Sequence, residues 1–418
     1  MTDANSVLLS IQRLQFVDPD AATKLLLGWF ELYMDLKVDR VRLVPKAVSL
    51  NSFNGFYTLD GEEYFFKTHV EELGVDQEYY NAQVLHDANY NIVLPLRTIH
   101  RFGMQMVIYP VIRWPEIFTL ARAIETGGET GGITVEQVIE AERRECERLL
   151  QIYDATLAPA TASEHARAPI HQLFWHRLAG ERLTSFYAGK AVPWPDQRAG
   201  ARLTFEDLLR YRWVINGTPI EGPQHTLGEL IEQGKTVLNP ERALHTVVGH
   251  GDAHFGNVFL EQQRRYLYFD PAFAGRHSPL LDIVKPLFHN VFAAWMYFGP
   301  DVARDLHITV ETRGETLYIE HDYRPSALRQ EILQVKLQRL VVPLLELLRG
   351  RNALPDDWSD ILRMALMCCP LLTINLLERL PAPVCWLGLS YVMQMGVQGA
   401  APPAGGTGVS PDNPFPTF

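Results

Sequence analysis

HGDAHFGN at residues 250–257 and YLYFD at residues 266–270 decide how this chain is interpreted. The first stretch places a carboxylate, Asp252, five residues before an amide, Asn257, and the second ends an apolar run on another carboxylate, Asp270. Carboxylate and amide oxygens suit Mg²⁺, which keeps several waters and shares its coordination shell with substrate phosphates. The remaining carboxylate can then orient a hydroxyl nucleophile and accept its proton.

The same residues allow a second interpretation. HGDAH contains a His-x-Asp-x-His arrangement, which binds zinc or iron in metallohydrolases. Such an enzyme needs further histidine ligands at compatible spacing, and no recognisable motif supplies them here. The amide and the second carboxylate therefore favour phosphoryl transfer.

The two stretches closely resemble the catalytic segment of the aminoglycoside phosphotransferase and choline kinase group, which is related to the protein kinases. In that group the loop Asp is the catalytic base, while the Asn and the strand-end Asp hold Mg²⁺ on the phosphates of ATP. The resemblance implies that Asp252 is the base and that Asn257 and Asp270 are metal ligands. It also implies that Asp282, in PLLDIV, supports the loop and that His250 braces it through hydrogen bonds.

The upstream half of the chain adds candidates for nucleotide binding. Lys67, in YFFKTH, follows an Asp60-Gly61 dipeptide that predicts a hairpin. The resemblance implies that Lys67 contacts the phosphates and pairs with a glutamate on the next helix. Glu78 is the best candidate for that glutamate, although Glu71 and Glu72 compete with it, and a lysine at a strand end can also be merely solvated.

Asn54-Gly55 occupies the place of the glycine-rich loop that covers the nucleotide phosphates. The dipeptide predicts a turn, and the surrounding SFNGF contains one glycine where protein kinases have GxGxxG. Departure from that pattern is common in the aminoglycoside phosphotransferase group. It therefore argues against a protein kinase more than against phosphoryl transfer.

The resemblance implies an α+β, bilobal, protein-kinase-like fold, with a small antiparallel-sheet N-lobe carrying one key helix and a larger, mainly helical C-lobe. We expect an N-terminal helical extension over residues 1–44 and a nucleotide-binding N-lobe over 45–112. The C-lobe, with the catalytic loop and the acceptor pocket, is expected over 113–400, and a flexible Pro/Gly-rich tail over 401–418. A length of 418 residues is compatible with two or three compact units.

Composition restricts the class of protein. The formal charge of −11 disfavours nucleic-acid binding, because an acidic surface repels phosphate backbones. The four cysteines form no CxxC pair, and the most apolar stretch, residues 364–377, is too short to span a bilayer. The N-terminus lacks the basic start and apolar stretch of a secretory signal. We therefore expect a cytoplasmic protein without a membrane or nucleic-acid partner, as a monomer or homodimer.

The predicted function is ATP- and Mg²⁺-dependent phosphorylation of a hydroxyl on a small molecule, such as an aminoglycoside, a sugar or a related natural product. The acceptor pocket is expected between residues 156 and 250 and in the helices after 285. Acids at Glu181, Glu206 and Asp207 would suit a cationic acceptor, but helix packing and a solvated surface require the same residues. Two alternatives remain: a catalytically silent kinase-like binding module and, less favoured, a protein-directed kinase.

Overall fold

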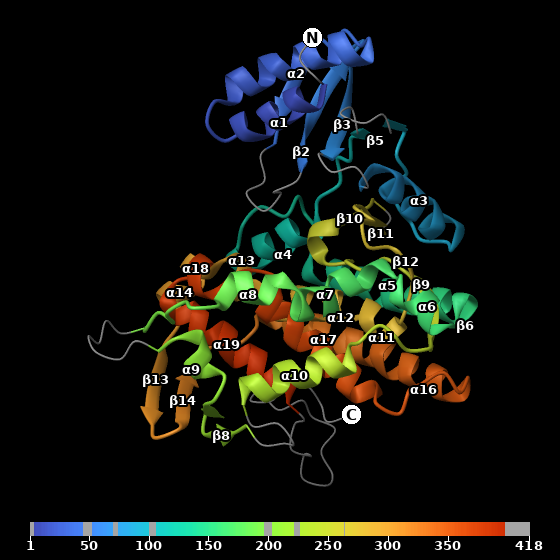
Figure 1. The fold of residues 1–418 in the computed structure, drawn as a ribbon. Coiled ribbons are helices and arrows are strands. Elements are labelled where there is room, and N and C mark those ends of the chain that lie inside the picture. Colours follow the sequence, from blue (N-terminus) through green and yellow to red (C-terminus); the bar gives the residue numbers. More distant parts are fainter. Residues whose placement is uncertain are drawn as a thin grey trace. The chain divides into compact units, whose positions relative to one another are not determined.

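The computed structural model describes residues 4–44, 52–69, 74–99, 106–195, 203–220, 226–262 and 264–397. The chain divides into two compact units, whose helices and strands are drawn in Figure 1. Unit 1 comprises Met1–Pro115 and Phe259–Ala274, and unit 2 comprises Glu116–Val258 and Gly275–Phe418. Both units contain helices and strands, so the chain has the mixed α+β character expected from its sequence.

Unit 1 is built on an antiparallel sheet of order β1-β2-β3-β5-β4. Its strands are β1 (Arg40–Leu43), β2 (Ser52–Leu59), β3 (Glu62–His69), β4 (Arg97–Ile99) and β5 (Met106–Pro110). Its helices are α1 (Ala4–Leu14), α2 (Pro19–Met34) and α3 (Gly74–Asp87). The predicted hairpin at Asp60-Gly61 is confirmed, because both residues adopt the positive φ that a tight β-turn requires.

The N-terminal helices belong to unit 1 instead of forming a separate extension. The Asp18 side chain caps α2 by accepting the Ala21 N–H at 3.0 Å. Phe30 of α2 is fully buried, and its ring lies 5.1 Å from that of Tyr57 and 5.8 Å from that of Phe66 on the sheet. Helices α1 and α2 therefore complete the hydrophobic core of the sheet.

Residues 259–274 also pack with unit 1, although the sequence analysis assigned them to the second domain. They follow from β10 (Val258–Leu260) into β11 (Tyr266–Tyr268), and the Val93 N–H donates to the Tyr268 carbonyl at 2.9 Å. Leu267 is buried in one hydrophobic cluster with Val93 and with Val107 and Tyr109 of β5. Contacts between segments distant in sequence, which a linear division cannot detect, place these residues in unit 1.

Asn54-Gly55 is not a turn, contrary to the sequence-based prediction. Both residues lie inside β2, where Asn54 is opposite Lys67 and Gly55 is opposite Phe66. A Cβ atom on Gly55 would lie 2.4 Å from the Arg42 carbonyl oxygen, so the glycine permits close approach of β1. The connection between β1 and β2, residues 44–51, lies largely outside the described residues.

Unit 2 is mainly helical and also carries two small sheets. One sheet has the order β12-β9-β6 and holds the HGDAH segment at the end of β9, and the other has the order β13-β14-β7-β8. The strands are β6 (Ala158–Ala160), β7 (Arg212–Ile215), β8 (Thr218–Pro219), β9 (Leu244–Gly249), β12 (Gly275–His277), β13 (Ile308–Arg313) and β14 (Thr316–His321). β13 and β14 form an antiparallel hairpin that turns at Gly314 and Glu315.

Two long apolar stretches of unit 2 form helices that are not regular along their whole length. The apolar run from 326 to 348 is divided by a π-helical turn at Leu337–Val341, and the run from 358 to 395 is interrupted after Leu372. The helices are α4 (Ile117–Thr126), α5 (Val135–Thr156), α6 (Ala162–Ala166), α7 (Trp175–Ala179), α8 (Glu181–Tyr187), α9 (Phe205–Leu208), α10 (Leu227–Val237), α11 (Pro279–Asp282), α12 (Val284–Val291), α13 (Ala294–Tyr297), α14 (Gly299–Asp305), α15 (Ala327–Lys336), α16 (Val342–Gly350), α17 (Trp358–Leu372), α18 (Leu376–Arg379) and α19 (Ala382–Gly396). Long-range packing, as between α17 and α19, builds the core.

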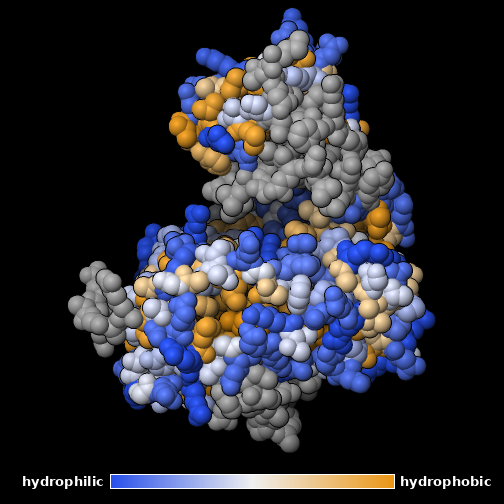
Figure 2. Space-filling model, in the orientation of Figure 1, coloured by the Kyte–Doolittle hydropathy of each residue, from blue (hydrophilic) through white to orange (hydrophobic). Residues whose placement is uncertain are grey.

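The face shown in Figure 2 is mostly hydrophilic over the described surface, and hydrophobic residues form smaller groups between hydrophilic ones. Among the helices of the described segments, none combines the length and apolar character needed to cross a bilayer.

Two salt bridges between α5 and the helical segment that begins with α15 differ sharply in burial. Lys336 of α15 lies 2.6 Å from Glu142 of α5, with 7% and 2% of their side chains exposed. Arg339 lies 3.4 Å from Glu147 of the same helix, with about half of each side chain exposed.

We expect Lys336→Met to lower the free energy of unfolding by about 3–5 kcal/mol, because it leaves the Glu142 carboxylate buried without its cation. The matched change Arg339→Met is expected to cost less than about 1 kcal/mol, since solvent screens that pair. Denaturant titrations of both variants measure the difference. If both variants lost the same free energy of unfolding, burial of the Lys336–Glu142 pair would not be what makes it important.

Candidate active site

The loop that follows β9 is held by one buried carboxylate. Asp282, the last residue of α11, accepts hydrogen bonds from the Gly251 N–H at 2.6 Å and from the Tyr153 hydroxyl at 2.5 Å. His277 Nε2 lies 2.9 Å from the same carboxylate. Gly251 has φ +80°, a conformation that favours glycine, and a Cβ on Gly249 would lie 2.5 Å from the Asp282 carboxylate. Asp282 thus supports the loop as the resemblance implied.

The environment keeps Asp282 ionised. Burial alone would raise the pKa of this carboxyl, but His277, the Tyr153 hydroxyl and the Gly251 N–H outweigh it and hold the pKa below its ordinary value. Because the folded-state pKa is the lower one, the carboxylate stabilises the fold fully above the unfolded pKa of about 3.9. That stabilisation is lost as the pH falls through the folded-state pKa.

Asp282→Asn should therefore lower the free energy of unfolding by about 2–3 kcal/mol at pH 7, since charge-assisted hydrogen bonds are lost. The difference in the free energy of unfolding between wild type and variant should become smaller as the pH falls below about 4. Urea titrations between pH 3 and 8 measure it, with Asp154→Asn as the control at a solvent-exposed ion pair. A gap independent of pH would contradict the role of the charge.

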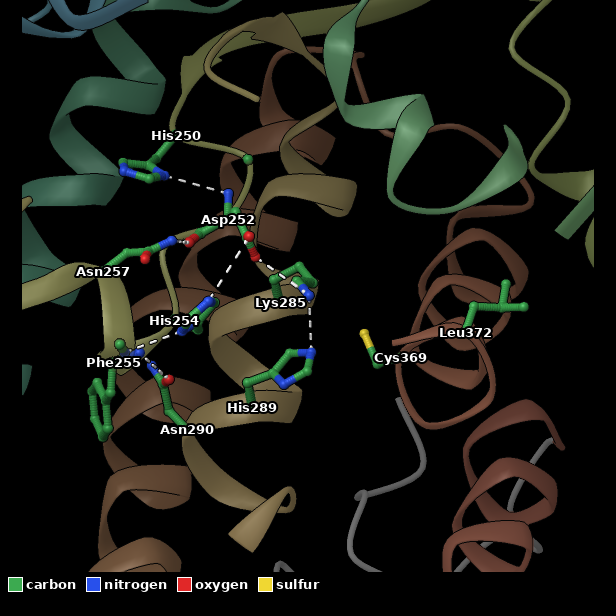
Figure 3. A network of polar contacts seen from close by, with 12 residues as sticks. His250, Asp252, His254, Phe255, Asn257, Lys285, His289, Asn290, Cys369 and Leu372 are labelled. Carbon is green, nitrogen blue, oxygen red and sulfur yellow. Dashed lines mark hydrogen bonds and ion pairs between the residues drawn. The ribbon is translucent and has the colours of Figure 1, made fainter. Parts of the chain in front are cut away.

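Asp252 projects from this loop toward two basic side chains (Figure 3). Its Oδ1 lies 3.3 Å from Lys285 Nζ, and its Oδ2 lies 3.9 Å from His254 Nε2. Burial acts to raise the pKa of Asp252, but Lys285, His254, Arg177 and His250 together lower it below the ordinary value. Asp252 is therefore a carboxylate at neutral pH, and 17% of its side chain remains exposed.

Asn257 and His250 fix the backbone around Asp252. Asn257 Nδ2 donates to the Asp252 carbonyl oxygen at 2.9 Å, which leaves Oδ1 as the atom able to bind a cation. The Asp252 N–H donates to His250 Nδ1 at 3.4 Å, a contact of the kind expected from a bracing histidine. The Phe255 N–H donates to Asn290 Oδ1 at 2.8 Å, which ties the end of the loop to α12 (Figure 3).

Lys285 is a site residue that the sequence analysis missed. It lies on α12, three residues after Asp282, and 6% of its side chain is exposed. Its Nζ also lies 3.0 Å from His289 Nε2, one helical turn away on the same face. A lysine and a histidine four residues apart in the otherwise apolar IVKPLFHN segment were the available signal.

In unit 1, the structure pairs Lys67 with Asp270. Lys67 Nζ of β3 lies 2.7 Å from Asp270 Oδ1, with 12% and 32% of their side chains exposed. Asp270 has φ +56°, and Asn81 of α3 donates to the carbonyl of the following Pro271 at 3.0 Å. Glu78, predicted as the partner of Lys67, lies on α3, but its side chain is outside the described residues.

The predicted site residues thus form two groups. Asp252 and Asn257 belong to unit 2, whereas Lys67, Asp270 and Asn54 belong to unit 1. Within the part of the chain that the structure describes, no three His, Cys, Asp or Glu side chains gather as a ready metal site. Asn257 and Asp270 each carry an oxygen of the hard kind that Mg²⁺ binds.

Two of the three acids proposed for a cationic acceptor accept hydrogen bonds from nearby backbone groups. Glu206 accepts the Gly189 N–H at 2.8 Å, and Asp207 forms a capping box with Thr204 at the start of α9. Glu181 is exposed in the first turn of α8. Glu206 and Asp207 therefore serve local structure, which was the alternative explanation for them.

Neither a scan of protein-family models nor a search of the curated proteins finds a match for this chain. Solved structures similar to it include a spectinomycin phosphotransferase in complex with ADP and spectinomycin, 12% identical over 89% of this chain and 97% of that one, with a TM-score of 0.41. A Plasmodium vivax ethanolamine kinase is 9% identical over 93% and 94%, with a TM-score of 0.46. A thermostable mutant of an aminoglycoside phosphotransferase is 11% identical over 88% and 95%, with a TM-score of 0.44.

These similar structures come from the group that the catalytic segment resembles. The identities are below 25% and the TM-scores below 0.5, so the similarities do not identify the activity of this chain.

Proposed function

We propose that this chain is an ATP- and Mg²⁺-dependent phosphotransferase that phosphorylates a hydroxyl of a small molecule. The observation that supports this best is the fixed loop around Asp252, in which an ionised, partly exposed carboxylate is held beside Asn257. The Lys67–Asp270 pair on unit 1 is the second support. Under this proposal the two units are the lobes of a protein-kinase-like fold.

The reaction needs few protein groups. The acceptor oxygen forms a bond to the γ-phosphorus of ATP while the bond from that phosphorus to the β-bridging oxygen breaks, and ADP leaves. Asp252 orients the acceptor hydroxyl and takes its proton. Mg²⁺ would neutralise charge on the phosphates when bound by Asn257 and Asp270.

The nucleotide-binding roles proposed for unit 1 follow from the resemblance. Lys67 would contact the phosphates, with Glu78 as its partner on α3 and with Asn54 and Gly55 near the phosphate-covering segment. The position of Asn54 opposite Lys67 in the sheet is compatible with such a role.

The alternative of a catalytically silent binding module is less well supported. Lys67, Asp252, Asn257 and Asp270 are all present, whereas inactive relatives of kinases usually lack at least one of them. A protein-directed kinase is disfavoured because GxGxxG is missing and few residues separate Asp270 from Ser278-Pro279, which leaves little room for an activation segment.

Asp252→Ala should leave the affinity for ATP within about twofold and reduce turnover at least about 100-fold, the usual effect of losing a general base. Turnover is measured as magnesium-dependent release of ADP with a panel of hydroxylated acceptors. Asp322→Ala, at an exposed carboxylate, is the control. Wild-type turnover by the Asp252 variant would show that another group is the base.

Chelation with EDTA should abolish turnover, and added Mg²⁺ should restore it. Asn257→Ala should raise the Mg²⁺ concentration for half-maximal turnover by about 10-fold or more, because one oxygen ligand is lost. The exposed Asn239→Ala serves as the control for a lost amide. An unchanged Mg²⁺ requirement in the Asn257 variant would remove this residue from the metal site.

A further inference from the structure

Arg329 joins two helices that pack against the loop carrying Asp252. It lies on α15, and 1% of its side chain is exposed. Its Nε and Nη2 donate to the Glu125 carboxylate of α4 at 2.5 and 3.3 Å, and its Nη1 donates to the Asn290 carbonyl of α12 at 2.9 Å. Both α4 and α12 also pack against the short helical turn Phe255–Asn257 at the end of the loop. One guanidinium group thus connects the two helices that support this turn.

The contact with α12 falls at the end of that helix. Asn290 lies in the last turn of α12, where carbonyl groups have no N–H partner within the regular helix. A positive charge is also favoured at this end, because the aligned peptide dipoles leave it partly negative. Arg329 therefore caps α12, and it does so at the residue whose side chain contacts the loop.

The side chain of Asn290 continues the path from Arg329 to the loop. Its Oδ1 accepts the Phe255 N–H at 2.8 Å, and both residues are buried (Figure 3). Phe255 follows Asp252 by three residues and precedes Asn257 by two. Hydrogen bonds therefore run without interruption from the Arg329 guanidinium through Asn290 to the backbone between these two candidate site residues.

Burial makes the Glu125–Arg329 pair a weak source of stability. Only 8% of the Glu125 side chain is exposed, and the Ser326 hydroxyl donates to its carboxylate at 2.8 Å. Removing two charges from water offsets most of their attraction, so well-packed apolar residues often stabilise a fold as well or better. Apolar residues cannot, however, direct a hydrogen-bond donor at one carbonyl oxygen. The pair is therefore better explained by the geometry it imposes than by the stability it adds.

We propose that Arg329 is a positioning residue for the catalytic loop and that it acts through Asn290 on the Phe255 N–H. Asp252 and Asn257 lie on either side of that N–H, so fixing it restricts the distance between their side chains. A misplacement of about 1 Å at a reacting group can reduce a rate about 100-fold. The expected effect on turnover rests on the proposed function, whereas the expected effect on the loop does not.

Hydrogen exchange of the full-length protein, measured by mass spectrometry on peptides covering residues 250–257, tests the effect on the loop without requiring turnover. The variant Glu125→Gln/Arg329→Met removes both charges of the pair, so neither is left buried alone. We expect its loop amides to exchange at least about 10-fold faster, as for a lost charge-assisted hydrogen bond, with peptides from α17 as the reference for global unfolding. The matched control Asp357→Asn/Arg242→Met, at another arginine–carboxylate pair of unit 2, should leave the loop as in wild type.

Two further variants separate positioning from a general structural effect. Arg329→Lys keeps the charge but lacks the planar fork that reaches both partners, so it should recover only part of the protection and still exchange about threefold faster than wild type. Asn290→Ala removes the acceptor of the Phe255 N–H. Because Arg329 acts through Asn290, changing Arg329 in the Asn290→Ala protein should add less than about twofold to the exchange rate of the loop.

Turnover completes the test. Glu125→Gln/Arg329→Met should lose at least about 10-fold in magnesium-dependent release of ADP, Arg329→Lys should lose less, and the control pair should retain wild-type turnover. The proposal is overturned if both Arg329 variants exchange as wild type does in the loop, if the effects of Arg329 and Asn290 add fully, or if the loop loosens without loss of turnover. Failure of the proposed function would appear separately, as wild-type protein without turnover whose loop still depends on Arg329.

Discussion

The buried Asp282 carboxylate is the constraint on which the candidate site depends. It receives the Gly251 N–H, His277 and the Tyr153 hydroxyl, so one negative charge connects α11, β12, α5 and the loop after β9. A buried carboxylate needs hydrogen-bond donors, and the Gly251 N–H supplies one of them from the loop after β9. Asp252 and Asn257 lie on this loop. The contacts of the buried Asp282 carboxylate therefore help to position the Asp252 carboxylate.

The electrostatics of Asp252 are set by elements far apart in the chain. Lys285 comes from α12, Arg177 from α7 and His254 from the loop itself, and together they keep the carboxylate ionised despite its burial. A base that must take a proton from an alcohol has to be ionised beforehand.

Unit 1 shows where a linear division of the sequence fails. Its sheet packs against α2, which precedes it in the sequence, and against residues 259–274, which follow much later. The apolar faces of a sheet must be buried against other elements, which need not be neighbours in the sequence. The strand position of Gly55 has a similar cause. Asn-Gly is a turn signal by local preference, but the close approach of β1 to this residue requires a glycine inside a strand.

Three features could be predicted from the sequence by itself. They are the spacing of Asp252, Asn257 and Asp270, the hairpin before Lys67, and the mixed α+β class of the fold. These follow from local patterns, in which neighbouring residues decide the outcome. Only the tertiary structure decided that Lys67 contacts Asp270, that Lys285 forms an ion pair with Asp252, and that Glu206 accepts the Gly189 N–H. Such pairings depend on how distant segments of the chain pack together. The sequence around a lysine or an acid therefore does not identify its distant partner.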